Sequence, residues 1–156
     1  MSGALVSTVL LAAWLGAALV VAAVVAPAAF AVLPTRTLAG ALVGRVLPVL
    51  FWSGILIGAL TALLAWPSIG FRGWRTAGAL GLIGACAAAQ LVVAPRIERV
   101  RAAIGGPVDA LDPSDPRRLA FGRLHGFSVL WLGVAGVSAL VVLVLLALIL
   151  TARRSS

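Results

Sequence analysis

The chain has 156 residues, of which 63% are hydrophobic and only 10% are charged, and its formal net charge at pH 7 is +8. A water-soluble domain carries roughly 25% charged residues, so this composition excludes an ordinary soluble fold and predicts one transmembrane domain over residues 1–156. The basic residues other than His125 are all arginines in short runs between apolar stretches, which indicates contact with lipid headgroups and no nucleic acid partner. Arginine without lysine, with abundant alanine, favours a bacterial origin.

The first apolar stretch predicts a membrane span over about residues 6–33. A spanning helix needs about 20 residues, because it rises about 1.5 Å per residue through a hydrocarbon core about 30 Å thick. Pro27 is expected to kink this helix, and Leu33 is a natural last residue because Pro34 follows it. The stretch is longer than the apolar region of a signal peptide and no Arg or Lys precedes it, so we expect a retained helix.

The second apolar stretch predicts a span over about residues 38–66. Arg45 within it should extend to the interface or pair, because a charge in the bilayer centre is costly. Small residues four apart permit close approach of helices. Two such pairs occur here, namely Gly40 with Gly44 and Gly54 with Gly58.

A short turn over residues 67–75 should make the second and third spans antiparallel neighbours. Three aromatic residues, Trp66, Phe71 and Trp74, are typical of an interfacial belt beside this turn. The third span is predicted over about residues 76–94, where Gln90 is the one strongly polar residue. Gln90 would either bond two helices together or belong to a polar path.

The only substantial extramembrane piece is expected over about residues 95–126, and the last span over about 127–150. The first part of the extramembrane piece has the pattern of a short amphipathic helix that either extends the third span or lies in the interface. Asp115 suits the N-cap of the last helix and Pro116 its first position. The sequence therefore predicts an all-α fold, an integral membrane four-helix bundle with a long loop between helices three and four. No internal repeat is evident at this level.

The arginines predict the orientation of the chain in a bacterial cytoplasmic membrane. Four spans place both termini and the middle turn on one side, with four arginines, and the long loop on the other side, with eight. Because cytoplasmic segments carry an excess of basic residues, we expect the loop 95–126 in the cytoplasm and both termini outside.

Four polar residues are candidates for a functional site: His125, Arg123, Arg96 and Gln90. His125 is the single histidine, and an imidazole can bind a metal or haem or transfer protons near neutral pH. The alternative is a structural hydrogen bond at the helix end, since one histidine provides one ligand and a zinc site needs three or four. Arg96, Gln90 and His125 could line one pocket, whereas Arg123 is expected to meet headgroups or loop carboxylates.

Three patches resemble the transmembrane protein 205-like family, also described as domain of unknown function 4149. The patches are Trp14-Leu15-Gly16 through Phe30 to Leu33-Pro34 with Gly40 and Leu47-Pro48, then Ala94-Pro95-Arg96, and then Phe121-Gly122-Arg123-Leu124-His125-Gly126-Phe127-Ser128. The resemblance implies a four-helix membrane domain with a long third loop. More distantly, the chain is similar to copper-resistance-D-like membrane proteins and four-helix protoporphyrinogen oxidases, which use several histidines where this chain has one.

The spans contain no nucleophile–base pair and no carboxylate pair, so we expect a small multi-pass membrane protein that is not an enzyme and assists metal or small-solute handling. No cofactor is expected. One alternative is a membrane redox protein in which His125 from two subunits of a dimer ligates haem or copper. Another is a structural partner of a second membrane complex. The expected partners are the lipid bilayer and, through small-residue helix faces, a second copy of the chain.

Overall fold

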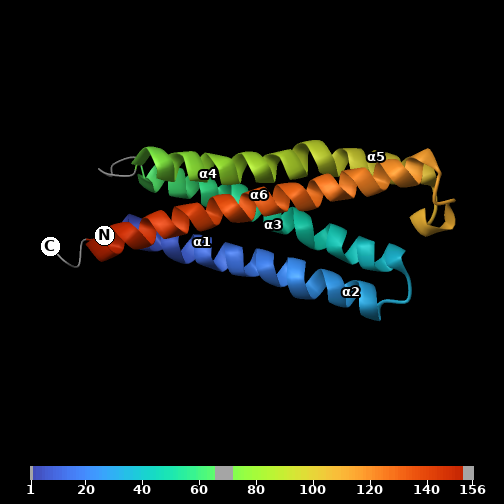
Figure 1. Cartoon of the computed structure of the whole chain (residues 1–156), viewed down its shortest axis with the longest axis horizontal. Coiled ribbons are helices and arrows are strands. Elements are labelled where there is room, and N and C mark those ends of the chain that lie inside the picture. Colours follow the sequence, from blue (N-terminus) through green and yellow to red (C-terminus); the bar gives the residue numbers. More distant parts are fainter. Residues whose placement is uncertain (1, 66–71, 153–156) are drawn as a thin grey trace.

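The computed structural model describes residues 2–65 and 72–152. Those residues form helices and connections without a strand, and four helices are long and apolar enough to cross a membrane. The protein is therefore an all-α, multi-pass membrane protein in contact with lipid, as its composition predicts. The start of the first helix and the end of the last lie at one end of an elongated bundle, and the connection before the last helix lies at the opposite end (Figure 1).

The first span consists of α1 (Ser2–Val20), a π-helical turn η1 (Val21–Val25) and α2 (Ala26–Val32). Pro27 has no N–H with which to continue the ordinary hydrogen-bond ladder. The π turn before Pro27 is wider than an α-helical turn, because the Ala26 N–H donates to the carbonyl of Val21, five residues back. This wider turn accommodates the proline. The chain becomes extended at Leu33, where the span was predicted to end.

The third span has the same construction, with α4 (Arg72–Ala87), a second π-helical turn η2 (Ala88–Val93) and α5 (Ala94–Ile104). The Ala94 N–H donates to the carbonyl of Ala89. The same four residues, Val-Val-Ala-Pro, span the end of each π turn and the start of the next helix, at positions 24–27 and 92–95. The two spans therefore share a short local motif around their prolines.

The other two spans are single α-helices, α3 (Arg36–Ala65) and α6 (Pro116–Ala152). The side chain of Thr35 caps α3 by accepting a hydrogen bond from the Leu38 N–H at 3.2 Å. Asp115 caps α6 in the same way, accepting from the Arg117 N–H at 2.8 Å, which confirms its predicted role.

The stretch 95–126 contains the two helical parts that the sequence predicts, because the third span continues as α5 to Ile104 and α6 begins at Pro116. The connection between them is a short segment with one 3-10 turn, η3 (Val108–Ala110). The predicted turn over 67–75 is shorter than expected, since α4 begins at Arg72, and residues 66–71 lie outside the described part of the chain.

The α5 helix ends at Gly105, which has a φ of +67° and donates its N–H to the carbonyl of Arg101. This left-handed conformation is strained for residues with a Cβ, so a glycine is needed where the chain turns back toward α6.

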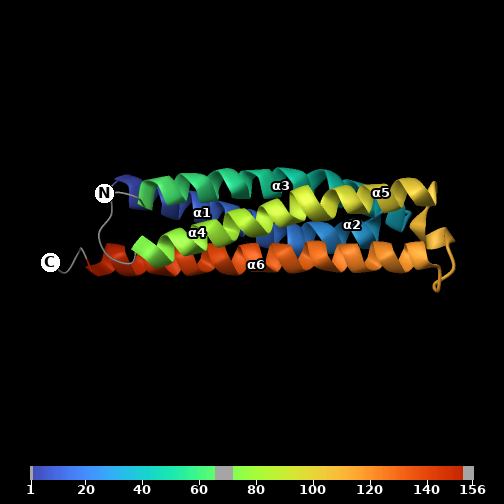
Figure 2. The same cartoon turned by 90° about the horizontal axis from the view of Figure 1, so that it is seen from above.

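The four spans form a ring in which α3 and α6 each pack between α1 and α4, as the turned view in Figure 2 also shows. Near the termini the ring is tight. A Cβ added at Gly58 would lie 2.7 Å from Ile83 Cγ1, and one added at Gly78 would lie 2.5 Å from Val142 Cγ2. The predicted close approach at Gly54 and Gly58 is thus confirmed, whereas Gly40 and Gly44 have no neighbour within 4 Å of an added Cβ.

The cap of α6 gives a pH-dependent prediction. Arg117 donates side-chain and backbone hydrogen bonds to the Asp115 carboxylate, and these lower the pKa of Asp115 from 3.8 to about 2. Because this pKa is lowered on folding, the stabilisation is complete above the unfolded value of 3.8 and is lost as pH falls toward 2. We expect Asp115→Asn, whose side chain still caps the helix, to show a smaller loss of thermal stability between pH 5 and pH 2 than the wild type. Equal losses in both proteins would contradict this role.

Candidate functional site

A cavity of about 480 Å³ lies at the loop end of the bundle, between the helix pair α2 and α3 and the pair α5 and α6. Its volume is in the range of about 300–1,000 Å³ that is typical of small-molecule sites. Toward this end α2 diverges from α5 in Figure 1. The cavity is lined by Phe30, Arg36, Thr37, Gly40, Val43, Gly44, Leu47, Pro48, Phe51, Gln90, Ala94, Ile97, Glu98, Arg101, Gly106, Val108, Asp109, Arg118, Phe121, Gly122, His125 and Ser128.

Two of the four candidate residues, Gln90 and His125, line this one cavity from different helices. Ser128 lies one helical turn from His125 and lines it too, as their spacing predicts. Arg96 and Arg123 are exposed and are not among the lining residues, so the structure does not bring them together with the other two.

The arginines that line the cavity are Arg36, Arg101 and Arg118, and the sequence analysis did not single them out. Arg36 lies between the first two predicted spans, and the other two lie in the predicted extramembrane stretch 95–126. The signal that could have found them is their position near helix ends that face each other across the cavity, which depends on how the helices pack.

The lining residues of α3 and α6 occupy equivalent helical positions. On α3 they include residues 40, 43, 44 and 47, and on α6 they include residues 118, 121, 122 and 125, so that both sets follow the spacing i, i+3, i+4, i+7. In both, positions i+4 and i+5 are the dipeptide Gly-Arg, Gly44-Arg45 and Gly122-Arg123, of which the glycine lines the cavity. The cavity therefore lies between two similar helix pairs, each with one π-containing span.

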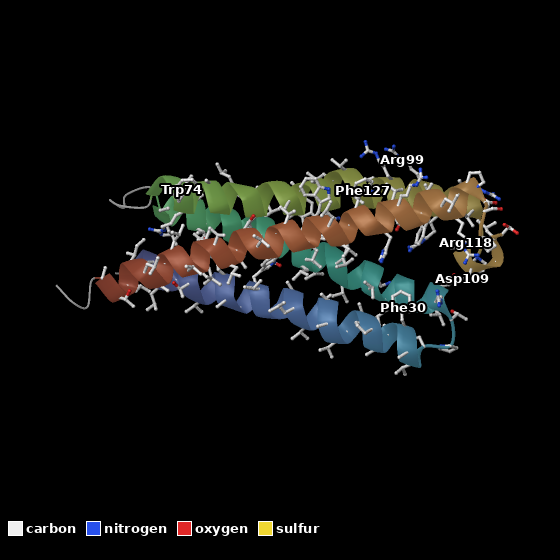
Figure 3. All side chains as sticks on the ribbon, in the orientation of Figure 1. Phe30, Trp74, Arg99, Asp109, Arg118 and Phe127 are labelled. Atoms are coloured by element: carbon white, nitrogen blue, oxygen red, sulfur yellow. The ribbon has the colours of Figure 1, made fainter. Side chains whose placement is uncertain are left out.

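Charged side chains gather at the loop end of the cavity, which we call its mouth. Arg101 forms an ion pair with Glu98 at 3.1 Å, and its guanidinium lies 5.9 Å from the ring centre of Phe121. Arg118 Nη1 donates to the carbonyl of Leu111 at 2.7 Å, which ties the loop to α6. Figure 3 shows Arg118 and Asp109 together at this end. No ion pair joins Arg36 or Arg118 to a carboxylate among the described residues.

The inner part of the cavity is apolar with a few neutral polar groups. Phe51 and Ser128 are 2% and 8% exposed and lie at its inner end. Gln90 comes from the π turn of the third span, a distortion often found at functional sites. Pro48 has no N–H, so the carbonyl of Gly44, which also lines the cavity, lacks its usual helical donor.

The side chains that line the cavity supply groups that can bind a ligand. In the described part of the chain, no three His, Cys, Asp or Glu residues form a group that could hold a metal ion. A single imidazole provides one ligand, whereas a zinc centre usually has three or four protein ligands. The arrangement supplies guanidinium groups, neutral hydrogen-bonding groups and an apolar wall.

A family model described as a domain of unknown function, DUF4149, matches residues 9–105. The match covers α2, α3, α4, α5 and most of α1, and it includes 14 of the 22 residues that line the cavity. No curated protein and no solved structure matches the chain. The resemblance to domain of unknown function 4149 is thus confirmed, while the links to transmembrane protein 205 and to copper-resistance-D-like proteins stay predictions.

Proposed function

We propose that this chain, which belongs to the DUF4149 family of unknown function, is a non-enzymatic membrane protein and binds a small solute in its cavity. The observation that carries the proposal is a cavity of about 480 Å³ between two similar helix pairs, with polar and apolar lining. In several transporter folds the substrate also binds between repeated units. Metal handling, the other half of the original hypothesis, has no ligand set among the described residues to support it.

We further propose that the cavity opens toward the cytoplasm of a bacterial cell. The mouth lies at the end of the bundle with eight of the twelve arginines, and basic residues favour the cytoplasmic side. An alkaline phosphatase fused after residue 156 should therefore be active, because that enzyme needs the outside compartment. A fluorescent reporter that works only in the cytoplasm should be dark at the same position. The opposite pattern would reverse the orientation.

Filling the cavity should remove a bound solute without unfolding the protein. Gly44 and Gly122 line the cavity, and a Cβ added at either would meet no atom within 4 Å. We expect the double variant Gly44→Leu/Gly122→Leu to fold at least as well as the wild type, because leucine favours a helix by nearly 1 kcal/mol per site over glycine. The measurement is native mass spectrometry of the protein in a non-ionic detergent, in which the wild type should carry an adduct that the variant lacks.

The matched control is Gly16→Leu/Gly133→Leu. Both glycines are exposed, both have free space around an added Cβ, and neither lines the cavity. This control should keep the adduct. Identical adducts in all three proteins, or none in the wild type, would contradict the proposal. An adduct with the mass of haem that disappears in His125→Ala would instead support the redox alternative.

A further inference from the structure

The charges at the mouth indicate what kind of solute the cavity takes, an inference that rests on the proposed function. The lining includes three guanidinium groups, on Arg36, Arg101 and Arg118, and two carboxylates, on Glu98 and Asp109. The ion pair of Arg101 with Glu98 at 3.1 Å offsets one charge of each sign. Among the lining residues, Asp109 is then the one carboxylate left for Arg36 and Arg118, so the lining keeps an excess of positive charge; Asp112, which also interacts with Arg118, lies outside the lining.

Two of these cations are available to an incoming anion. Arg36 begins α3 and is exposed, and no described residue forms an ion pair with it. Arg118 is held in place by a hydrogen bond to a loop carbonyl, which leaves its other guanidinium nitrogens without a carboxylate in the described chain. Guanidinium groups bind carboxylate and phosphate oxygens well, through paired and charge-assisted hydrogen bonds.

Beyond the mouth the cavity becomes apolar and deep. On α3 its lining continues through Val43 and Leu47 to the buried ring of Phe51. Fifteen residues separate Arg36 from Phe51, which corresponds to roughly 22 Å along a helix. Phe30 of α2 adds a further aromatic ring to this wall. The mouth is at the ends of the helices, where headgroups lie, and the wall runs toward the middle of the bilayer.

We propose that the cavity binds a single-chain amphipathic anion. Its carboxylate or phosphate lies between Arg36 and Arg118, and its apolar chain lies along Phe30, Leu47 and Phe51. The ligand would lie in the cavity as a lipid lies in the membrane. Its charged group is at the depth of the headgroups, and its chain is in the hydrocarbon region. A volume of about 480 Å³ suits one chain, as in a fatty acid or a lysophospholipid.

The test uses the full chain in a non-ionic detergent and four probes of known charge. The probes are oleate, oleoyl lysophosphatidate, monoolein and inorganic phosphate. We expect the two acidic single-chain lipids to bind at one per chain, and to raise the thermal unfolding temperature as a ligand of the native state does. Monoolein, which has the same chain and no charge, should bind at least ten-fold more weakly, and inorganic phosphate should have no effect.

Arginine variants identify the recognition site. Arg36→Gln should weaken oleate binding several-fold, and Arg36→Gln/Arg118→Gln should weaken it at least ten-fold. The matched control is Arg96→Gln/Arg99→Gln, which removes the same charge from exposed positions that do not line the cavity; Arg99 points away from the bundle in Figure 3. Because Arg118 also ties the loop, the single variant Arg36→Gln keeps the test valid if the double variant is less stable.

The outcomes separate this inference from the proposed function. Equal binding of monoolein and oleate, or equal effects of the two arginine pairs, would overturn the anionic ligand and leave a solute site in place. Binding of inorganic phosphate as tight as that of the acidic lipids would overturn the amphipathic ligand. Oleate binding that Gly44→Leu/Gly122→Leu does not reduce would place the lipid elsewhere and would contradict both.

Discussion

Replacing Trp14 with alanine is expected to lower the free energy of unfolding by about 3–5 kcal/mol, the range for deleting a large buried aromatic side chain. The side chain is 3% exposed and packs in the core of the bundle. Its Nε1–H donates to the carbonyl of Leu50 at 2.9 Å, next to Phe51 at the inner end of the cavity. Trp14 thus stabilises the boundary between the tight half of the bundle and the hollow half.

The hydrogen bond and the packing can be measured separately. Trp14→Phe keeps most of the aromatic ring and removes the donor, so its cost should be only about 0.5–1.5 kcal/mol. Trp74→Ala is the matched control, because Trp74 is 72% exposed and its loss should change stability by less than about 0.5 kcal/mol. Unfolding by titration with sodium dodecyl sulfate, followed by circular dichroism, gives the three values. A cost for Trp14→Ala no greater than that of Trp74→Ala would refute this role.

The number and type of spans could be predicted because hydropathy over about 20 residues is a property of the chain alone. The caps at Leu33 and Asp115 were predicted for a similar reason, since a residue before proline and an N-cap carboxylate act on their own backbone. Such local rules do not depend on the neighbouring helices.

The cavity could not be predicted in this way, because it depends on which faces of four helices meet. Gln90 shows the difficulty. It lies in a π turn, where each hydrogen bond spans five residues, so ordinary helical spacing gives the wrong face for the residues that follow. Arg96 follows this turn and lies outside the cavity lining, although helical spacing allowed it to share a pocket with Gln90 and His125.

The two glycine pairs of α3 also show that a contact depends on the neighbouring helix. Gly40 with Gly44 and Gly54 with Gly58 have the same spacing on the same helix. The second pair packs against α4, whereas the first pair borders the cavity. The spacing permits close approach, but the position of the partner helix decides whether it happens.

Gly54→Ala is expected to destabilise the bundle by about 1–3 kcal/mol, although alanine is the better helix former, because it overfills a packed contact. The new Cβ would lie 2.7 Å from Cys86 Sγ and 3.0 Å from Trp14 Cε2. Gly84→Ala is the matched control on the neighbouring helix, since an added Cβ there meets nothing within 4 Å. It should be neutral or stabilising by up to about 1 kcal/mol.

The contact with Cys86 predicts a specific rescue. Cys86 is fully buried, and Cys86→Ala removes the sulfur atom that the new methyl group would meet. Residues in direct contact do not act additively, so Gly54→Ala/Cys86→Ala should be less destabilised than the sum of its single variants, by about 1 kcal/mol. The same detergent titration measures this coupling. Additive costs would mean that the backbone of α3 moves away from α4 instead, and the tight half of the bundle would then be more deformable than its glycine contacts imply.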